Sequence, residues 1–501
     1  MKTSMKLALF ATALLTSTSA YAQAFRIGLA EDPDVLDPDR ARTYVGRIVF
    51  TSLCDKLVDI TPKLDFVPQL ATEWSWNDDK TALTFKLRDG VTFHDGTTFD
   101  AEAVKANIER STTLSDSNRK SELNAVESVT VDDPLTVTIN LKHPDAPLLA
   151  TLSDRAGMMM SPQAFAEGKE FSQAPVCSGP YEFVRRVQND RIELKKYENY
   201  WNAAEYPLEA VTFQPITDAT VKLANLRAGD LDMLERLAPS DVPSVKDDTS
   251  LQFVPVTGLG YGSIRFNVNN GDRAKQPIGA DKRVRQAFQY AVGRDIIDQV
   301  AGNGIFPPAQ QPFPPSSPFL SDKFPVTERN LDKAKELLKE AGVENPSFEL
   351  VFGTGSANQQ LAELIQAMAA EAGFQINLRA TEFAAMQQEM EQGNFDAAII
   401  NWSGRVDPDG NIYTFVACDG NLNDSKYCNE EVDKNLNAAR LETDVATRKP
   451  LYDAAQAILQ EDLPLMYTYY QPWPFVLATN VKGFEPYPDG MIRLKGMSVE
   501  K

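Results

Sequence analysis

The spacing of apolar and polar positions predicts strands in the N-terminal half of the chain and a long helix in the C-terminal half. Residues 83–87 (LTFKL) and 135–141 (LTVTINL) alternate apolar and polar side chains, which is the period of a strand with one buried face. A period of four residues predicts one continuous helix with a core-facing stripe along Val284, Phe288, Val292, Ile296 and Val300.

A strand–helix–strand unit follows in the C-terminal half. Asn330 caps a predicted helix that Gly342 is placed to end. Beyond this helix the pattern predicts a strand over 348–352, a helix over 359–372 and a second strand over 374–378. Strands that alternate with helices in this way are typical of a parallel sheet, so we expect an α/β fold.

The chain is too long for one hydrophobic core. It has 501 residues, and domains average roughly 100 to 200 residues. We therefore expect two or three lobes. Residues 264–270 alternate like a strand that crosses between lobes, and residues 467–472 are the expected return, so that the two together form a hinge. The proline-rich stretch 307–318 is interpreted as a surface loop.

The N-terminus has the pattern of a secretory signal peptide over residues 1–22. Two lysines precede a short apolar run, and Ala20-Tyr21-Ala22 forms an A-x-A cleavage site. The apolar run is shorter than the roughly 20 residues that span a bilayer. No cysteine follows the cleavage point, since the first one is Cys54. We expect a periplasmic protein that begins at Gln23 and carries no lipid anchor.

The charge balance restricts the possible partners. The formal net charge is −20 for the whole chain, and removal of Lys2 and Lys6 with the signal peptide makes the remainder more acidic still. Such a surface repels phosphate backbones and anionic lipids. We expect no nucleic-acid partner and no binding to anionic membranes.

Four cysteines in an exported chain predict two disulfides, for which three connectivities are possible. We favour Cys418 with Cys428, because the segment between them is rich in turn residues, and this choice leaves Cys54 with Cys177. The alternative is a zinc site built from the four cysteines. It is not favoured because no C-x2-C pair occurs, so we expect no metal.

The sequence contains no familiar catalytic motif. A G-x-S-x-G elbow, an H-E-x-x-H helix, a Walker loop and a G-x-G-x-x-G turn after a strand are all missing. We expect that the protein is not an enzyme and uses no cofactor. The alternative is an exported hydrolase acting on a small solute, with a pair of carboxylates among the 70 acidic residues.

Several motifs in order along the chain carry a family resemblance. The longest are residues 70–76 (LATEWSW) and 83–97 (LTFKLRDGVTFHDGT), and shorter ones lie at 178–181, 226–232 and 281–287. With these motifs the chain resembles the peptide/opine/nickel family of bacterial extracellular solute-binding proteins of ABC transporters.

The resemblance implies a periplasmic-binding-protein type II-like fold, in which two crossing strands join two lobes and an extra subdomain is inserted near the N-terminus. Lobe I would comprise residues 23–265 and 475–501, with the inserted subdomain at about 66–195, and lobe II residues 266–474. It also implies that the protein is a monomer, captures a peptide, an opine or another amino-acid derivative, and delivers this solute to the membrane permease of an ABC transporter.

The loop at 401–410 is the main candidate for ligand binding. It follows the buried-strand pattern of 395–400, and ligands of open α/β sheets gather at the carboxyl ends of strands. In peptide-binding members of the family, this loop has a tryptophan and, three residues later, an aspartate that binds the peptide amino group. Here Trp402 is present, but Arg405 stands at the aspartate position, and Asp407 is an alternative anchor.

A second difference from dipeptide binders also argues against a plain dipeptide as the ligand. Where those relatives have an arginine for the peptide carboxylate, residues 352–358 offer only small and hydroxyl groups, among them Thr354 and Ser356. We therefore expect a solute that carries a carboxylate. Alternatively, Arg405 pairs with Asp407 or Asp409 and has no role in binding. Aromatic walls of the cleft are expected from Tyr44, Tyr261 and Tyr469.

Overall fold

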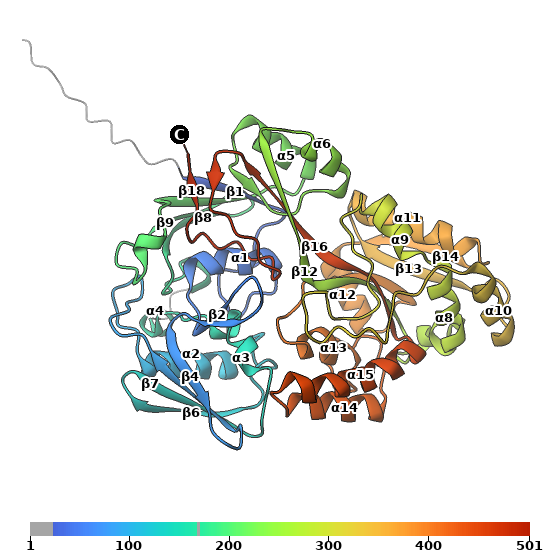
Figure 1. Cartoon of the computed structure of the whole chain (residues 1–501), viewed down its shortest axis with the longest axis horizontal. Coiled ribbons are helices and arrows are strands. Elements are labelled where there is room, and N and C mark those ends of the chain that lie inside the picture. Colours follow the sequence, from blue (N-terminus) through green and yellow to red (C-terminus); the bar gives the residue numbers. More distant parts are fainter. Residues whose placement is uncertain (1–23, 168–170, 501) are drawn as a thin grey trace, which may run out of the picture.

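The computed structural model describes residues 24–167 and 171–500, so the predicted signal peptide lies outside the described residues. One mixed sheet of ten strands runs through both halves of the protein (Figure 1). Its strand order is β14 (Gln375–Thr381), β13 (Ser347–Gly353), β15 (Ala397–Trp402), β12 (Leu251–Phe266), β16 (Leu465–Ala478), β11 (Met233–Leu234), β1 (Phe25–Leu29), β10 (Ala210–Pro215), β9 (Arg191–Lys196) and β8 (Tyr181–Val187).

The long strands β12 and β16 cross from one lobe to the other as an antiparallel pair (Figure 1). Their register is interrupted between Thr257 and Tyr261, and only beyond this point does β12 also pair with β15. A Cβ on Gly260 would lie 1.8 Å from the carbonyl oxygen of Trp402, so this position needs glycine. The crossing therefore lies near residues 258–260, earlier than the expected 264–270, whereas the expected return at 467–472 is part of β16.

A smaller antiparallel sheet forms the N-terminal insertion (Figure 1). Its order is β4 (Ala71–Trp76), β5 (Ala82–Leu87), β7 (Thr136–Leu141) and β6 (Val126–Asp133), and α2 (Ala101–Thr113) packs against it. The predicted strands at 83–87 and 135–141 are confirmed. Strands β8 and β9 pair with β10 in the large sheet and are not part of this smaller sheet.

The C-terminal half follows the predicted strand–helix–strand pattern. Helix α10 (Leu331–Ala341) is capped by the Asn330 side chain and ends at Gly342 in the left-handed conformation. Strands β13 and β14 pair in parallel and are joined by α11 (Ser356–Ala370). The remaining helices of this half are α7 (Pro277–Ala280), α8 (Lys282–Ala291), α9 (Arg294–Ile296), α12 (Phe383–Glu391), α13 (Asp409–Val416), α14 (Glu430–Arg440) and α15 (Val445–Asp462).

Two predictions for this half are wrong. The stripe from Val284 to Val300 is not one helix, because α8 gives way at Val292 to extended backbone and a π-helical turn follows α9; Val300 is consequently 47% exposed. The proline-rich segment is not a surface loop. Ala309 and Phe313 are buried against α13, α14 and α15 in a hydrophobic core, since prolines favour extended backbone that can pack as well as it can link.

The first lobe contains the remaining short elements. Helix α1 (Tyr44–Leu53) lies in its core, which also includes β1 and β10. The others are α3 (Leu148–Thr151), α4 (Pro162–Ala166), α5 (Ala219–Ala228), α6 (Val242–Lys246), β2 (Val58–Ile60), β3 (Phe66–Pro68), β17 (Val481–Lys482) and β18 (Ser498–Val499). Within residues 24–167 and 171–500, no helix is both long and apolar enough to cross a bilayer.

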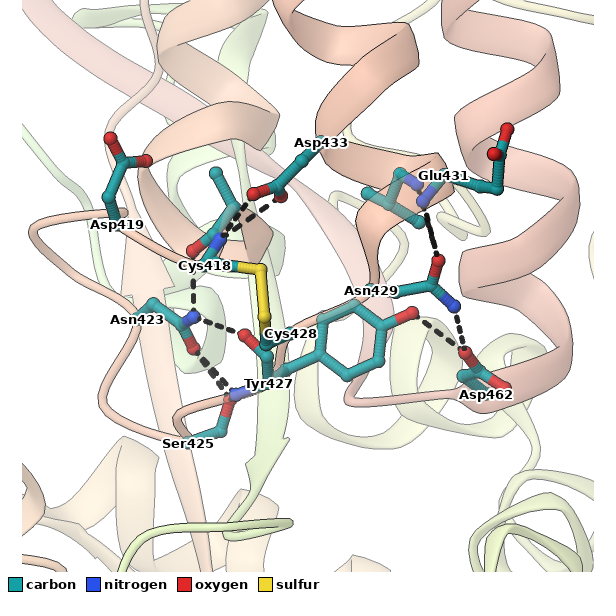
Figure 2. Close-up of a disulfide and its surroundings, with 12 residues drawn as sticks. Cys418, Asp419, Asn423, Ser425, Tyr427, Cys428, Asn429, Glu431, Asp433 and Asp462 are labelled. Carbon is teal, nitrogen blue, oxygen red and sulfur yellow. Dashed lines mark hydrogen bonds between the residues drawn. A yellow bond between two sulfur atoms is a disulfide. The ribbon is translucent and has the colours of Figure 1, made fainter.

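Both predicted disulfides are present, with Cα–Cα distances of 4.8 Å for Cys54–Cys177 and 4.5 Å for Cys418–Cys428. Figure 2 shows that the second one closes a loop whose buried Asn423 side chain donates to the carbonyl oxygens of Ala417 and Tyr427. The described part of the chain contains no cluster of side chains suited to a metal ion.

Removing the disulfide of this loop by the paired changes Cys418→Ser and Cys428→Ser is expected to lower the free energy of unfolding by about 2 to 3 kcal/mol, because the open loop gains conformational entropy in the unfolded chain. Urea unfolding under non-reducing conditions measures the change. An unaltered midpoint, or free thiols at both positions in freshly isolated protein, would contradict the expectation.

Candidate ligand-binding site

The loop that joins β15 to α13 is held in one conformation by Asn411. The amide of this buried residue accepts hydrogen bonds from the Trp402 indole (2.9 Å) and the Arg405 backbone N–H (2.8 Å), and it donates to the Arg405 carbonyl oxygen (2.9 Å). Tyr261 donates to the Asn411 carbonyl oxygen (2.9 Å). The positions of Trp402 and Arg405 are therefore fixed by the first turn of α13.

Gly404 brings the same loop against the crossing strand. Its φ is +89°, a region that favours glycine, and a Cβ there would lie 2.3 Å from the carbonyl carbon of Leu259. The loop thus adjoins the part of β12 where the register is interrupted. A rotation of the lobes at this point would move the loop relative to the first lobe.

The Arg405 guanidinium lies over the Trp402 ring, 4.5 Å from its centroid, and donates to the Gly404 carbonyl oxygen (2.8 Å). Its Nε is 3.9 Å from Oδ2 of Asp154, which belongs to the first lobe. Burial and the charge of Arg47 lower the pKa of Arg405 to about 10, so the side chain is still cationic at neutral pH. Arg405 thus reaches the opposite lobe.

The two neighbouring aspartates have other partners. Both oxygens of Asp407 accept hydrogen bonds from Arg448, at 2.7 and 2.8 Å, and one of them also accepts from the Asp409 backbone N–H. Asp409 lies 3.4 Å from Arg440. The alternative in which Arg405 pairs with Asp407 or Asp409 therefore differs from the arrangement found.

The lobes also meet at a second place, near the ends of α13 and α14. The backbone N–H of Ala146, in the first lobe, donates to the carbonyl oxygen of Arg440 (2.8 Å). Burial raises the pKa of the adjacent Asp145 to about 6 and that of Asp409 to about 7, against the opposing charge of Arg440. Protonation of these two carboxyls is therefore coupled to folding.

The raised pKa of Asp409 makes a stability contribution that depends on pH. This contribution is fully present below the unfolded-state pKa of about 4 and is lost as pH rises through about 7. Asn is isosteric and does not ionise. Asp409→Asn is therefore expected to gain stability relative to wild type as pH is raised from about 5 to about 8. Urea midpoints at several pH values test this, and a constant difference between the two proteins would contradict it.

The three candidate tyrosines have different surroundings. Tyr44 is half-buried, stacks on Trp473 with 4.3 Å between centroids, and donates to the Gly490 carbonyl oxygen (2.5 Å). Tyr261 has no exposed surface and packs edge-on against Tyr467. Tyr469 is 3% exposed and stacks on Phe306. Tyr261 and Tyr469 thus lie in hydrophobic cores, and only Tyr44 retains appreciable exposure.

Thr354 lies between β13 and α11, Ser356 is the first residue of α11, and both side chains are exposed. Because β13 and β15 pair in parallel, their carboxyl ends meet at the same edge of the sheet, which brings this segment and the Trp402 loop to one side of the second lobe.

Three residues of the first lobe that sequence reasoning missed lie close to Arg405. Asp154 accepts a hydrogen bond from Nε of Arg47 on α1 (3.0 Å), and its other carboxylate oxygen forms an ion pair with Nη2 of Arg47 (2.7 Å). Arg155 donates to the Ala41 carbonyl oxygen (2.7 Å). The cations around Asp154 hold its pKa well below the usual range despite its burial. No local pattern marks these residues, because they approach Arg405 only through the packing of the two lobes.

Comparison with known protein sequences finds a family match over most of the chain. Residues 65–423 match the family described as bacterial extracellular solute-binding proteins, family 5 Middle. The glutathione-binding protein GsiB of Pectobacterium atrosepticum is 28% identical over 468 residues, which are 91% of this chain and 90% of that protein.

Two solved structures show how far the likeness extends in three dimensions. The dipeptide binding protein of Pseudoalteromonas sp. SM9913 in complex with Met-Leu matches with a TM-score of 0.85 at 23% identity, over 95% of this chain and 100% of that one. AgaA of A. tumefaciens R10 in complex with agropinic acid matches with a TM-score of 0.83 at 24% identity, over 96% and 99%. The expected type II periplasmic-binding-protein fold is confirmed, and these relatives are binding proteins rather than enzymes. The family match spans most of this chain, and the chain therefore belongs to the bacterial extracellular solute-binding proteins of family 5.

Proposed function

We propose that this protein is the periplasmic binding protein of an ABC importer, that it captures a small carboxylate-bearing solute of the peptide or opine type between its lobes, and that it delivers this solute to the membrane permease. The observation that carries the proposal is Arg405, a cation on the sheet edge of the second lobe that faces the first lobe at Asp154. In this proposal the protein is exported by the leader at residues 1–22 and acts as a monomer without catalysis.

The ligand class follows from the chemistry of this position. A guanidinium offers a planar fork of donors that matches a carboxylate, whereas Asp407, the alternative anchor, is already occupied by Arg448. Two of the relatives named above are described with glutathione and with agropinic acid, both of which carry carboxylates, and the third with the dipeptide Met-Leu. We therefore favour such solutes over plain dipeptides.

Closure would connect binding to delivery. A solute held by both lobes stabilises the closed arrangement because it binds the open one less well. Expulsion of water from between the lobes strengthens the attraction between Arg405 and an anion. The permease would then recognise the closed, loaded protein.

The experiment that tests the function is native mass spectrometry of protein purified from periplasm, followed by calorimetry with glutathione, agropinic acid and Met-Leu. Saturable binding of a carboxylate solute without turnover supports the proposal. Turnover of the bound solute would favour the exported hydrolase, and a natural ligand without any anionic group would overturn the proposed ligand class.

Lobe closure itself makes a separate prediction. Saturation with a ligand that binds is expected to reduce the radius of gyration. The strands β12 and β16 connect the lobes, and the interruption of their register at residues 258–260 of β12 allows a hinge motion there. Small-angle X-ray scattering with and without ligand measures this. An unchanged radius of gyration at saturation would contradict a hinge at this place.

A further inference from the structure

Four arginines from both lobes gather around Asp154. We call Arg47, Arg119, Arg155 and Arg405 the arginine cluster. Arg47 and Arg405 share one oxygen of Asp154, at 2.7 and 3.9 Å. Arg119 and Arg155 both donate to the carbonyl oxygen of Ala41, at 3.3 and 2.7 Å. The cluster thus extends from α1, through the two segments that follow α2 and α3, to the Trp402 loop of the second lobe.

The arginine cluster carries more positive charge than its surroundings balance. Among the described residues, the carboxylates that form ion pairs with members of the cluster are Asp154, with Arg47 and Arg405, and Glu122, with Arg119, so four cations face two paired carboxylates. Asp489 also acts on Arg47, but it pairs with Arg493. Two positive charges remain in excess where the lobes meet.

The cluster also has unused hydrogen-bond donors. Arg47, Arg119 and Arg155 are 5%, 3% and 4% exposed. Among the described residues, no hydrogen-bond partner is present for the buried Nη1 of Arg47 or for Nε of Arg119 and Arg155. Burial of a cation without a counter-charge and with an unmet donor is costly. Burial and the nearby charge of Arg119 accordingly hold the pKa of Arg155 well below its usual value.

We propose that the first-lobe members of the arginine cluster bind a second anionic group of the ligand, so that the solute is a dicarboxylate with one carboxylate on Arg405 and the other facing Arg47, Arg119 and Arg155. This inference rests on the proposed function and specifies its ligand. The two excess charges of the cluster would be balanced by the two carboxylates. The ligand would then connect both lobes through ionic contacts, and Asp154 would keep Arg47 and Arg405 in place.

Three probes with one or two carboxylates separate the inference from the proposed function. Glutathione has two carboxylates, its glycine ethyl ester has one, and agropinic acid has one. Wild-type protein is expected to bind glutathione at least about thirtyfold more tightly than the ester, since loss of one partner of a buried charged contact costs at least about 2 kcal/mol. Calorimetry gives both affinities.

Arg155→Gln tests whether the cluster causes this selectivity. The variant is expected to lose most of the preference for glutathione over the ester, because the ester lacks the second carboxylate that Arg155 would contact. Arg294→Gln is the matched control, because Arg294 is equally buried at 1% exposed and also has a nitrogen without a hydrogen-bond partner, but it bonds Tyr467 and Gln289 within the second lobe. Thermal unfolding of both variants establishes that they are folded.

The outcomes are distinct. Equal binding of glutathione, its ester and agropinic acid would overturn the dicarboxylate inference and leave the proposed function standing. Selectivity for glutathione that Arg155→Gln does not change would overturn the assignment to the first-lobe arginines. If none of the carboxylate probes binds, the proposed function itself fails. Binding of glutathione with selectivity that only Arg155→Gln removes supports the inference.

Discussion

Arg405→Ala is expected to weaken binding of a carboxylate ligand by roughly 2 to 5 kcal/mol, because the anion would be left buried without its charged partner. This corresponds to a loss of about thirtyfold or more in affinity. Arg405→Lys should recover only part of the loss, since an ammonium group cannot form the two parallel hydrogen bonds of a guanidinium. Calorimetry on wild type and both variants measures the effect.

A merely structural role for Arg405 predicts a much smaller effect. Its contact with Asp154 is long, at 3.9 Å, and its side chain is 22% exposed, and a pair of this kind is worth under about 1 kcal/mol. Arg185→Ala is a suitable control for general loss of positive charge, because the exposed side chain of Arg185 on β8 pairs with Glu193 on the neighbouring strand β9. An Arg405→Ala variant that binds within a factor of about five of wild type would contradict the proposed anchor.

The fold could be predicted from local signals where these agree with one another. The Asn330 cap, the Gly342 terminus and the strands on either side of α11 all match the structure, because each depends on a few neighbouring residues. Both disulfides were also predictable, since only one pair flanks a short turn-rich segment.

The predictions of secondary structure and exposure are wrong where tertiary packing overrides the local pattern. Val284 to Val300 has helical spacing, yet the chain changes to extended backbone at Val292 and a π-helical turn follows. Likewise, Ala309 and Phe313 stand among prolines, but they complete the core between α13 and α15. Apolar periodicity states which residues can share a face, and it does not state whether the backbone remains helical between them.

In the candidate site, too, residues on one continuous segment could be predicted from the sequence, whereas residues brought together by packing could not. Trp402 and Arg405 were identifiable because they follow a buried strand on one continuous segment. Asp154 and the arginines Arg47, Arg119 and Arg155 come from separate parts of the first lobe, and each has an ordinary sequence context. Only the packing of the two lobes places them next to Arg405, and no local pattern of the sequence indicates this.

The other large effect concerns Asp407. Replacement of this residue by asparagine is expected to lower the free energy of unfolding by about 3 to 5 kcal/mol, because Arg448 would remain buried without a counter-charge. The two side chains are 12% and 5% exposed, and they are joined by two hydrogen bonds. Arg448 also donates to the Tyr452 hydroxyl (3.0 Å), so that the pair connects the Trp402 loop to α15.

The double variant Asp407→Leu with Arg448→Met provides the matched comparison. Removing both charges avoids the unpaired cation, so the double variant should be more stable than Asp407→Asn. Urea unfolding of the three proteins measures this order, and a single variant within about 1 kcal/mol of wild type would contradict a buried pair. Calorimetry well below the unfolding temperature separates stability from binding: with Arg405 as the anchor, folded Asp407→Asn should retain affinity within a factor of about five, whereas a larger loss would make Asp407 part of the ligand contact.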